Sequence, residues 1–211
     1  MSATMLEPPG RVAAHPELPP RMPHAGRRRM PALARLALRL AGWRIENAPP
    51  DLPKMVMVVA PHTSNWDFPV GLAVMFALDM RATWLGKHTL FRGPFGRWLR
   101  RTGGMPVRRH GGGASGQWGS VPAAVEAFRD AERMLLVLAP EGTRRQVRAW
   151  KSGYHAIAQG AGVPVVPAWI DWSRRVVGFG PAVDPSPGLE ATTAALQAFF
   201  RAEMARDPAR Y

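Results

Sequence analysis

The chain has 211 residues, 46% of them apolar, which suits a single domain with a sizeable core. It contains no cysteine, which excludes disulfide bridges, cysteine-ligated zinc or iron–sulfur centres and a cysteine nucleophile. Its 28 Lys and Arg residues against 15 Asp and Glu residues give a formal charge of +13, and such a field attracts nucleic acid, an anionic bilayer or phosphorylated substrates. A genomic bias toward Ala, Gly, Pro and Arg would produce a similar excess of arginine.

The first 29 residues are rich in proline, arginine and small residues and show no apolar periodicity. We therefore expect a disordered arm over residues 1–29 and a single domain over residues 30–211. No apolar run approaches the ~20 residues of a membrane-spanning helix, and no basic segment leads directly into the apolar core of a signal peptide. A membrane role would have to be peripheral.

Residues 31–42 predict a short helix that begins at a proline and ends at a glycine. Its basic side chains, Arg35 and Arg39, share one face. The apolar face comprises Leu33, Leu36, Ala37 and Leu40. Two interpretations stay open, because such a helix can lie on an anionic membrane or pack on the core as the first helix of the domain.

Four apolar runs with strand character follow, and helical patterns lie between and after them. The runs cover 55–60, 103–107, 134–139 and 163–170. The helical patterns cover about 67–80, 94–102, 121–132, 151–160 and 189–205. Runs this apolar suit strands that are covered on both faces. Their alternation with helices predicts an α/β fold.

Polar side chains follow the first three runs. His62 comes after the first run, Arg108 and Arg109 after the second, and Glu141 and Arg144 after the third. In α/β sheets, functional sites collect where strands end and the chain turns into loops or helices. We therefore expect these side chains to meet at one sheet edge.

The stretch "HTSNWD" places His62 and Asp67 at a strand-to-helix corner. We expect Thr63, Ser64 or Asn65 to cap the following helix, and Asp67 to accept a hydrogen bond from the imidazole. The other ring nitrogen then remains free to act as a general base. There is no G-x-S-x-G motif, and Ser64 is badly placed for attack, so the base would activate a substrate hydroxyl. The alternative is a loop histidine beside a helix-capping aspartate.

The stretch "APEGTRRQVRAWKSG" begins with Glu141, a glycine that permits a tight turn, and Arg144. The guanidinium fork of Arg144 suits a phosphate or carboxylate. A solvated basic loop paired with Glu141 is the alternative.

Between residues 87 and 109, basic residues alternate with aromatic ones. The basic residues include Lys87, Arg92, Arg108 and Arg109, and the aromatic ones are Phe91, Phe95 and Trp98. This pattern fits nucleic acid, an anionic amphiphile, or an ordinary helix surface.

The glycine-rich stretch 111–116 satisfies G-x-G-x-x-G, but Arg108, Arg109 and His110 separate it from the preceding strand. We therefore interpret it as a flexible loop and expect no dinucleotide cofactor there.

Taken together, these blocks resemble the lysophospholipid acyltransferase superfamily, typified by 1-acylglycerol-3-phosphate acyltransferases. The superfamily's ordered blocks are matched by "HTSNWD", "GGMPVRR", "EGTR" and "VPVVP", and "KHTLFRGPFG" matches a further stretch. The resemblance covers roughly residues 50–185. The chain departs from the pattern at Asn65, Trp66, Arg108 and Ala139, which leaves the acceptor more open than the chemistry.

The resemblance implies a mixed, largely parallel sheet covered by helices on both faces, as in glycerol-3-phosphate acyltransferase, and the compact bacterial type without transmembrane helices. It implies that His62 deprotonates an acceptor hydroxyl while Asp67 holds the ring, and that the hydroxyl attacks the donor thioester directly. It assigns substrate binding to the following residues: Lys87, Arg109, Glu141, Gly142, Thr143 and Arg144.

The implied activity transfers a fatty acyl group from acyl-CoA or acyl carrier protein to a lysophospholipid, most naturally 1-acylglycerol-3-phosphate. It requires no metal or other cofactor, involves an anionic membrane surface and no nucleic acid, and places the protein in the cytoplasm, peripheral on the inner face of the cell membrane. The alternatives are another lipid acceptor, such as an acyl-amino-acid lipid, a hydrolase, or a non-catalytic protein that binds lipid or polyanions.

Overall fold

The computed structural model describes residues 16–110, 113–115 and 120–211. Of these residues, 108–110 and 113–115 are described by their backbone alone. The helices are α1 (Met30–Leu40), α2 (Asp67–Ala77), α3 (Gly93–Arg101), α4 (Val121–Asp130), α5 (Gly153–Ala161) and α6 (Leu189–Gln197), with short 3-10 turns η1 (His88–Phe91), η2 (Ala202–Met204) and η3 (Pro208–Arg210). The strands are β1 (Arg44–Ile45), β2 (Lys54–Ala60), β3 (Thr83–Lys87), β4 (Gly104–His110), β5 (Gly113–Ser115), β6 (Met134–Leu138), β7 (Val165–Asp171) and β8 (Val176–Phe179).

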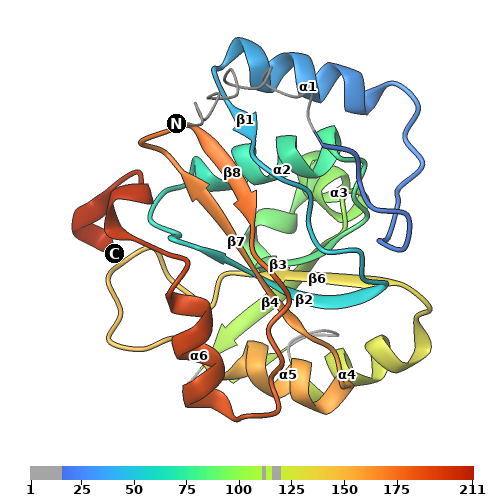
Figure 1. Cartoon of the computed structure of the whole chain (residues 1–211). Helices are drawn as coiled ribbons and strands as arrows, with labels where there is room; N and C mark the ends of the chain where they lie inside the picture. Colours follow the sequence, from blue (N-terminus) through green and yellow to red (C-terminus); the bar gives the residue numbers. More distant parts are fainter. Residues whose placement is uncertain (1–15, 111–112, 116–119) are drawn as a thin grey trace, which may run out of the picture.

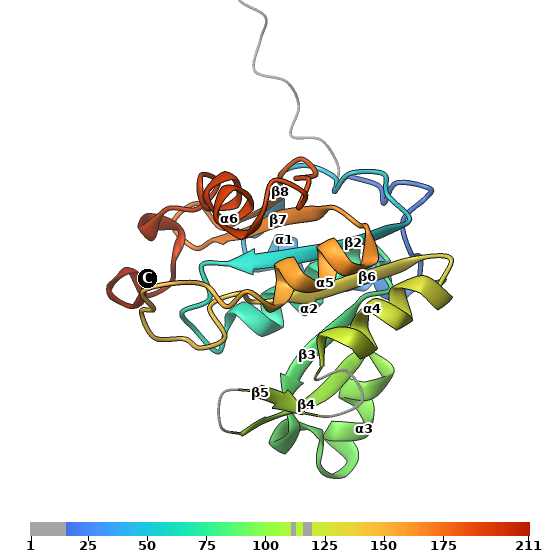
Figure 2. The same cartoon turned by 90° about the horizontal axis from the view of Figure 1, so that it is seen from below.

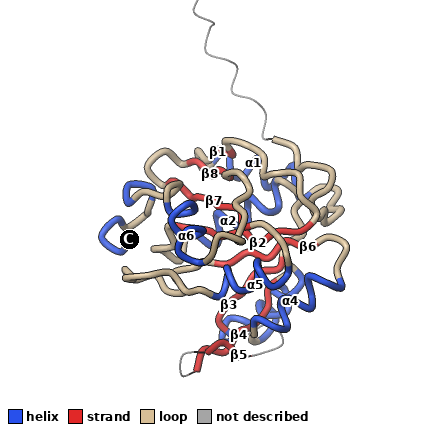
Figure 3. Tube along the Cα trace, turned by 60° about the horizontal axis from the view of Figure 1, so that its bottom comes forward, coloured by secondary structure: helices blue, strands red, loops and turns tan. Residues whose placement is uncertain are grey.

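The described strands form one sheet in the order β1-β8-β7-β2-β6-β3-β4-β5, which Figure 3 shows from top to bottom. The central strands β7, β2, β6, β3 and β4 are parallel. Antiparallel pairing occurs only toward the two edges of the described sheet, between β7 and β8 and between β4 and β5. The fold is therefore a mixed, largely parallel α/β sheet, as the sequence predicted.

Helices cover both faces of this sheet. Figure 1 shows α1 and α2 above it and α4, α5 and α6 below it. The sequence of β2 explains this arrangement, because successive side chains of a strand point to opposite faces. Met55 and Met57 belong to the core under α1 and α2, whereas Val56 and Val58 belong to the core under α4 and α5. A strand that is apolar on both faces is thus buried on both.

Helix α1 packs on the core of the domain, which is one of the two interpretations that the sequence left open. It buries Ala34 and Leu38, and its leucine face points into solvent. The large exposed side chains of α1 are Met30 (42% exposed), Leu33 (61%), Leu36 (53%) and Leu40 (81%). Arg35, on the inner side, donates from Nε to the backbone oxygen of Ala77 in α2. The helix therefore docks on the domain through its narrower face.

The prediction of a disordered arm over residues 1–29 is wrong for residues 16–29. Leu18 and Met22 are buried in the core beneath α1 and α2. The backbone of Arg21 donates to Asp51, and the backbone nitrogens of Gly26 and Arg27 donate to the Asp79 carboxylate. These long-range contacts order a segment that has no regular secondary structure of its own. Residues 1–15 lie outside the described part.

The glycine-rich stretch also differs from the prediction. Gly113–Ser115 forms β5, which pairs antiparallel with the end of β4 and extends the sheet by one short strand. The prediction of a flexible loop is therefore wrong for these three residues, and Gly111, Gly112 and Gly116 lie outside the described part. Among the described residues, no helix combines the length and apolar character that a membrane crossing requires.

Candidate active site

The parallel strands β2, β6 and β3 end at the same edge of the sheet, and the predicted site residues follow these ends. His62 comes two residues after β2, Glu141 three residues after β6, and Lys87 is the last residue of β3. Arg109 belongs to β4, the next parallel strand, and its side chain lies outside the described part. One edge thus carries residues that are far apart in sequence.

His62 and Asp67 form a hydrogen-bonded pair at the start of α2. The distance from Nδ1 of His62 to Oδ2 of Asp67 is 3.2 Å. The side chain of Asp67 is 2% exposed and that of His62 is 21% exposed. The carboxylate holds a proton on Nδ1, so Nε2 is an acceptor, and Nε2 has no hydrogen-bond partner within the described residues. This arrangement could serve an oriented general base.

Two further donors hold the Asp67 carboxylate. The backbone nitrogen of Ser64 donates to Oδ2 at 2.8 Å, and the indole Nε1 of Trp172 donates to Oδ1 at 2.8 Å. The buried charge of Asp67 is therefore satisfied on both oxygens, as burial requires. Sequence reasoning missed Trp172. It follows directly after β7, so the same rule of strand ends, applied to the fourth apolar run, would have found it.

The predicted helix cap is wrong. The N-cap residue of α2 is Trp66, and its side chain makes no capping hydrogen bond. Asp67 instead bonds back to the Ser64 amide, while Ser64 Oγ accepts a hydrogen bond from the Trp66 amide at 3.2 Å. The acidic residue in the first turn of α2 thus closes the loop that carries His62.

Glu141 lies against the backbone of His62. Both of its carboxylate oxygens are 3.2 Å from the His62 amide nitrogen, and the residue is 5% exposed. Burial raises the pKa of Glu141, and the hydrogen bond from His62 opposes this rise. The loop after β6 therefore meets the loop after β2.

The remaining residues of the Glu-Gly-Thr-Arg block occupy an exposed turn. Gly142 has a φ of +66°, and a Cβ there would lie 2.8 Å from the Lys151 side chain, so this position requires glycine. Thr143 Oγ1 accepts from the Arg145 amide at 3.4 Å. Arg144 is exposed three residues beyond Glu141 and forms no ion pair with a described carboxylate. The turn therefore presents an arginine without a described ion-pair partner, three residues beyond the carboxylate that contacts His62.

The last ten residues lie at the same edge of the sheet. In Figure 2 the C-terminus is near the end toward which the β2 arrow points. The guanidinium of Arg206 lies 4.6 Å from the ring centroid of Trp172 and 5.3 Å from that of Trp66. The Asp207 amide donates to Thr63 Oγ1 at 3.3 Å. Burial raises the pKa of Tyr211, and the negative charge of Glu141 adds to this rise. Sequence reasoning assigned no role to this segment.

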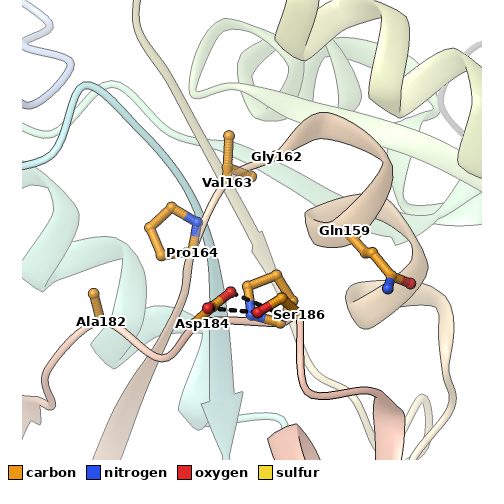
Figure 4. A pocket seen from close by; sticks show the side chains of 8 residues that line it. Gln159, Gly162, Val163, Pro164, Ala182, Asp184 and Ser186 are labelled. Carbon is orange, nitrogen blue, oxygen red and sulfur yellow. Dashed lines mark hydrogen bonds between the residues drawn. The ribbon is translucent and has the colours of Figure 1, made fainter.

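A pocket elsewhere does not belong to this site. It is open, has a volume of about 410 Å³ and is shown in Figure 4. Its lining residues are Gln159, Gly162, Val163, Pro164, Ala182, Asp184, Pro185 and Ser186. Val163 and Pro164 precede β7, so the pocket lies at the amino ends of the parallel strands, opposite the edge that carries His62. The described residues contain no cluster of three or more His, Asp and Glu side chains arranged to hold a metal.

Comparisons with known proteins give one family match and one similar crystal structure. Residues 44–171 match the family model described as Acyltransferase. The structure is similar to the crystal structure of the 1-acyl-sn-glycerophosphate (LPA) acyltransferase PlsC from Thermotoga maritima, with a TM-score of 0.54 and 19% sequence identity. The similarity covers 81% of this chain and 78% of that chain. A search of curated protein sequences finds no match.

Proposed function

The chain belongs to the acyltransferase family, and we propose that it moves a fatty acyl group from a thioester donor to the free hydroxyl of a lysophospholipid. The observation that carries this proposal is the oriented imidazole of His62. Its Nδ1 is held by buried Asp67, and its Nε2 faces no protein partner among the described residues. A base in this state suits proton abstraction from an incoming hydroxyl.

The proposed reaction is a direct transfer. His62 Nε2 accepts the hydroxyl proton of the acceptor as its oxygen attacks the carbonyl carbon of the donor thioester. The new C–O bond forms, the C–S bond breaks, and the imidazolium returns the proton to the leaving thiolate. Asp67 stabilises the imidazolium through the 3.2 Å contact at Nδ1. A thioester is already activated, so holding donor, acceptor and base together supplies much of the rate, on the order of several kcal/mol.

The anionic headgroup of the acceptor would bind to the cations at the same edge. We assign this role to Arg144, with Lys87 and Arg109 assisting. Lys87 ends β3, Arg144 lies in the loop after β6, and both are exposed. Gly142 and Thr143 shape the turn that presents Arg144. Glu141 binds the His62 amide, so we propose that it holds the base in place rather than touching the glycerol.

The proposed acceptor is 1-acylglycerol-3-phosphate, and the proposed donor is acyl-CoA or acyl carrier protein. The name of the similar Thermotoga maritima protein supports this acceptor. The alternative acceptor is another lipid, such as an acyl-amino-acid lipid, since the Asn65-Trp66 pair next to the base departs from the usual pattern. We propose that no metal or redox cofactor takes part.

The proposed setting is the inner face of the cell membrane, to which the protein binds peripherally. The exposed leucines of α1 support this setting, because a helix with one apolar face exposed to water suits the boundary between headgroups and acyl chains.

The function is tested with purified protein, both donor types and a panel of acceptors, with the products identified by mass spectrometry. Phosphatidic acid formed from 1-acylglycerol-3-phosphate is the expected product. If only a different lipid is acylated, the proposed acceptor is wrong but the proposed acyl transfer stands. Release of free fatty acid without acylated product would indicate a hydrolase, and binding without turnover would contradict the enzymatic proposal.

A further inference from the structure

The segment from residue 80 to residue 125 has an extreme charge composition. It contains no Asp or Glu and eight of the chain's 28 Lys and Arg residues. It builds β3, η1, α3, β4 and β5, which form the lower end of the molecule in Figure 2. The excess positive charge of the protein is therefore concentrated at one end of the sheet.

Helix α3 presents apolar side chains to solvent in this basic region. Phe95 is 58% exposed and Trp98 is 42% exposed, and their rings stack with centroids 5.7 Å apart. Leu90, in the 3-10 turn before α3, is 47% exposed. The helix packs inward through buried Gly96 and Leu99, so its exposed aromatic side chains are not needed for the core.

The cations around this apolar group have no counter-ions among the described residues. Arg92, Arg97, Arg100 and Arg101 are all exposed, and none forms an ion pair with a carboxylate in the described part of the chain. Arg100 lies over the Phe91 ring, 5.3 Å from its centroid. An anionic partner would therefore meet several unneutralised guanidinium groups beside a stacked aromatic pair.

This combination fits an anionic lipid bilayer. Aromatic side chains favour the boundary between headgroups and acyl chains, and arginines near an anionic leaflet each contribute to binding. The surface also begins beside the edge of the sheet that carries His62, because η1 directly follows Lys87, the last residue of β3. A bilayer bound here would lie close to the base.

We propose that the outer surface of η1 and α3 is the surface by which the protein docks onto an anionic bilayer. This surface, the α3 surface, comprises Leu90, Arg92, Phe95, Arg97, Trp98 and Arg101. The proposal rests on the proposed function only in that the acceptor is a lipid, since docking is measured without turnover. The exposed leucines of α1 then provide at most a second contact.

The test measures co-sedimentation of the full chain with phosphatidylcholine vesicles, with and without about one third phosphatidylglycerol. We expect the wild type to bind the anionic vesicles and to be released by salt. The double variant Arg97→Gln/Arg101→Gln should bind the anionic vesicles about tenfold more weakly or worse. The variant Phe95→Ser/Trp98→Ser should lose binding to a similar extent, because its apolar contact with the boundary is gone.

The matched control is Leu189→Ser, which removes an exposed leucine (38%) from α6 on the other face of the sheet and should bind like the wild type. The double variant Leu33→Ser/Leu36→Ser measures how much α1 contributes to vesicle binding. Melting temperatures near that of the wild type exclude unfolding. If both α3 variants bind anionic vesicles like the wild type, the proposal is overturned. It is also overturned if they lose affinity only for an acidic carrier protein or an oligonucleotide.

Turnover with a short-chain lysophospholipid below its micelle concentration separates the two proposals. The Phe95→Ser/Trp98→Ser variant should retain wild-type kcat with this monomeric acceptor, because both side chains are exposed and their ring contact is with each other. A kcat that falls together with vesicle binding would contradict docking as the role of the surface. A wild type that binds vesicles but transfers no acyl group would leave the docking surface intact and remove the proposed function.

Discussion

The indole Nε1 of Trp172 donates a 2.8 Å hydrogen bond to Oδ1 of Asp67, the carboxylate whose other oxygen holds His62. Trp172 is thus placed to orient His62, the proposed base, through Asp67. The Trp172 ring is itself fixed by an edge-to-face contact with Trp43, at 4.9 Å between centroids. His62, Asp67 and Trp172 at the end of β7 therefore form one hydrogen-bonded unit.

The Trp172→Phe variant should lower kcat about tenfold or more, because a hydrogen bond to a charged group is worth roughly 1.5–3 kcal/mol. KM values should change little, since Trp172 is placed to act on the base and not on a bound substrate. The measurement is steady-state kinetics with both substrates varied. The matched control, Trp43→Phe, alters the aromatic contact but leaves the indole donor in place, and should keep most of kcat. Equal kcat values for wild type and Trp172→Phe would refute this role.

Arg206 should contribute less to kcat than Trp172 does, and it should act through its contacts with the rings of Trp66 and Trp172. Exposed cation–π contacts are worth about 0.5–1 kcal/mol each, so Arg206→Gln should lower kcat a few-fold. Arg201→Gln, at an exposed arginine directly before this segment, serves as the control and should leave kcat unchanged. A larger effect at position 201 than at 206 would show that general charge, not the aromatic contact, matters.

Glu141 gives a prediction for the pH dependence of stability. Because burial raises its pKa above the ordinary value of 4.5, the folded protein binds this proton more tightly than the unfolded chain does. The stability due to this group is fully present below the unfolded pKa and is lost as pH rises through the folded pKa.

Glu141→Gln removes this titration and keeps an acceptor oxygen for the His62 amide. We expect the Tm of the variant minus that of the wild type to increase as pH is raised from about 4 to about 8, measured by calorimetry. A difference that stays constant or decreases over this range would contradict the assignment.

Gly142→Ala should destabilise the protein by about 1–3 kcal/mol, because the residue has a φ of +66° and the added Cβ would meet Lys151. The control is Gly71→Ala, within α2, where a Cβ meets nothing within 4 Å. That substitution should stabilise by about 0.5–1 kcal/mol. Denaturant unfolding measures both. A neutral Gly142→Ala would show that the turn relaxes easily.

The sequence predicted the parts of the fold and site that depend on local pattern. The four apolar runs appear as β2, β4, β6 and β7, and the rule that sites lie at strand ends correctly brought Glu141 to His62. What local pattern cannot show is a contact made by a segment with no regular structure. Met22, completely buried, lies in such a segment, and so does Arg206.

Four of the described strands, β1, β3, β5 and β8, were not predicted, and two of them were missed for a related reason. Strand β3, "TWLGK", is only partly buried and contains a glycine and a lysine, so it does not form an apolar run. Strand β8 is buried but has only four residues, "VVGF". Trp172 was missed because the rule of strand ends was not applied to the fourth apolar run, where a single tryptophan after a strand resembles ordinary core.

The most direct test of the account is acyl transfer by His62→Ala, measured beside the wild type with labelled donor at saturating substrate concentrations. The account predicts a loss of at least about a hundredfold in kcat, with an unchanged far-UV circular dichroism spectrum. A folded His62→Ala protein that transfers acyl groups at the wild-type rate would contradict the assignment of the imidazole as the base.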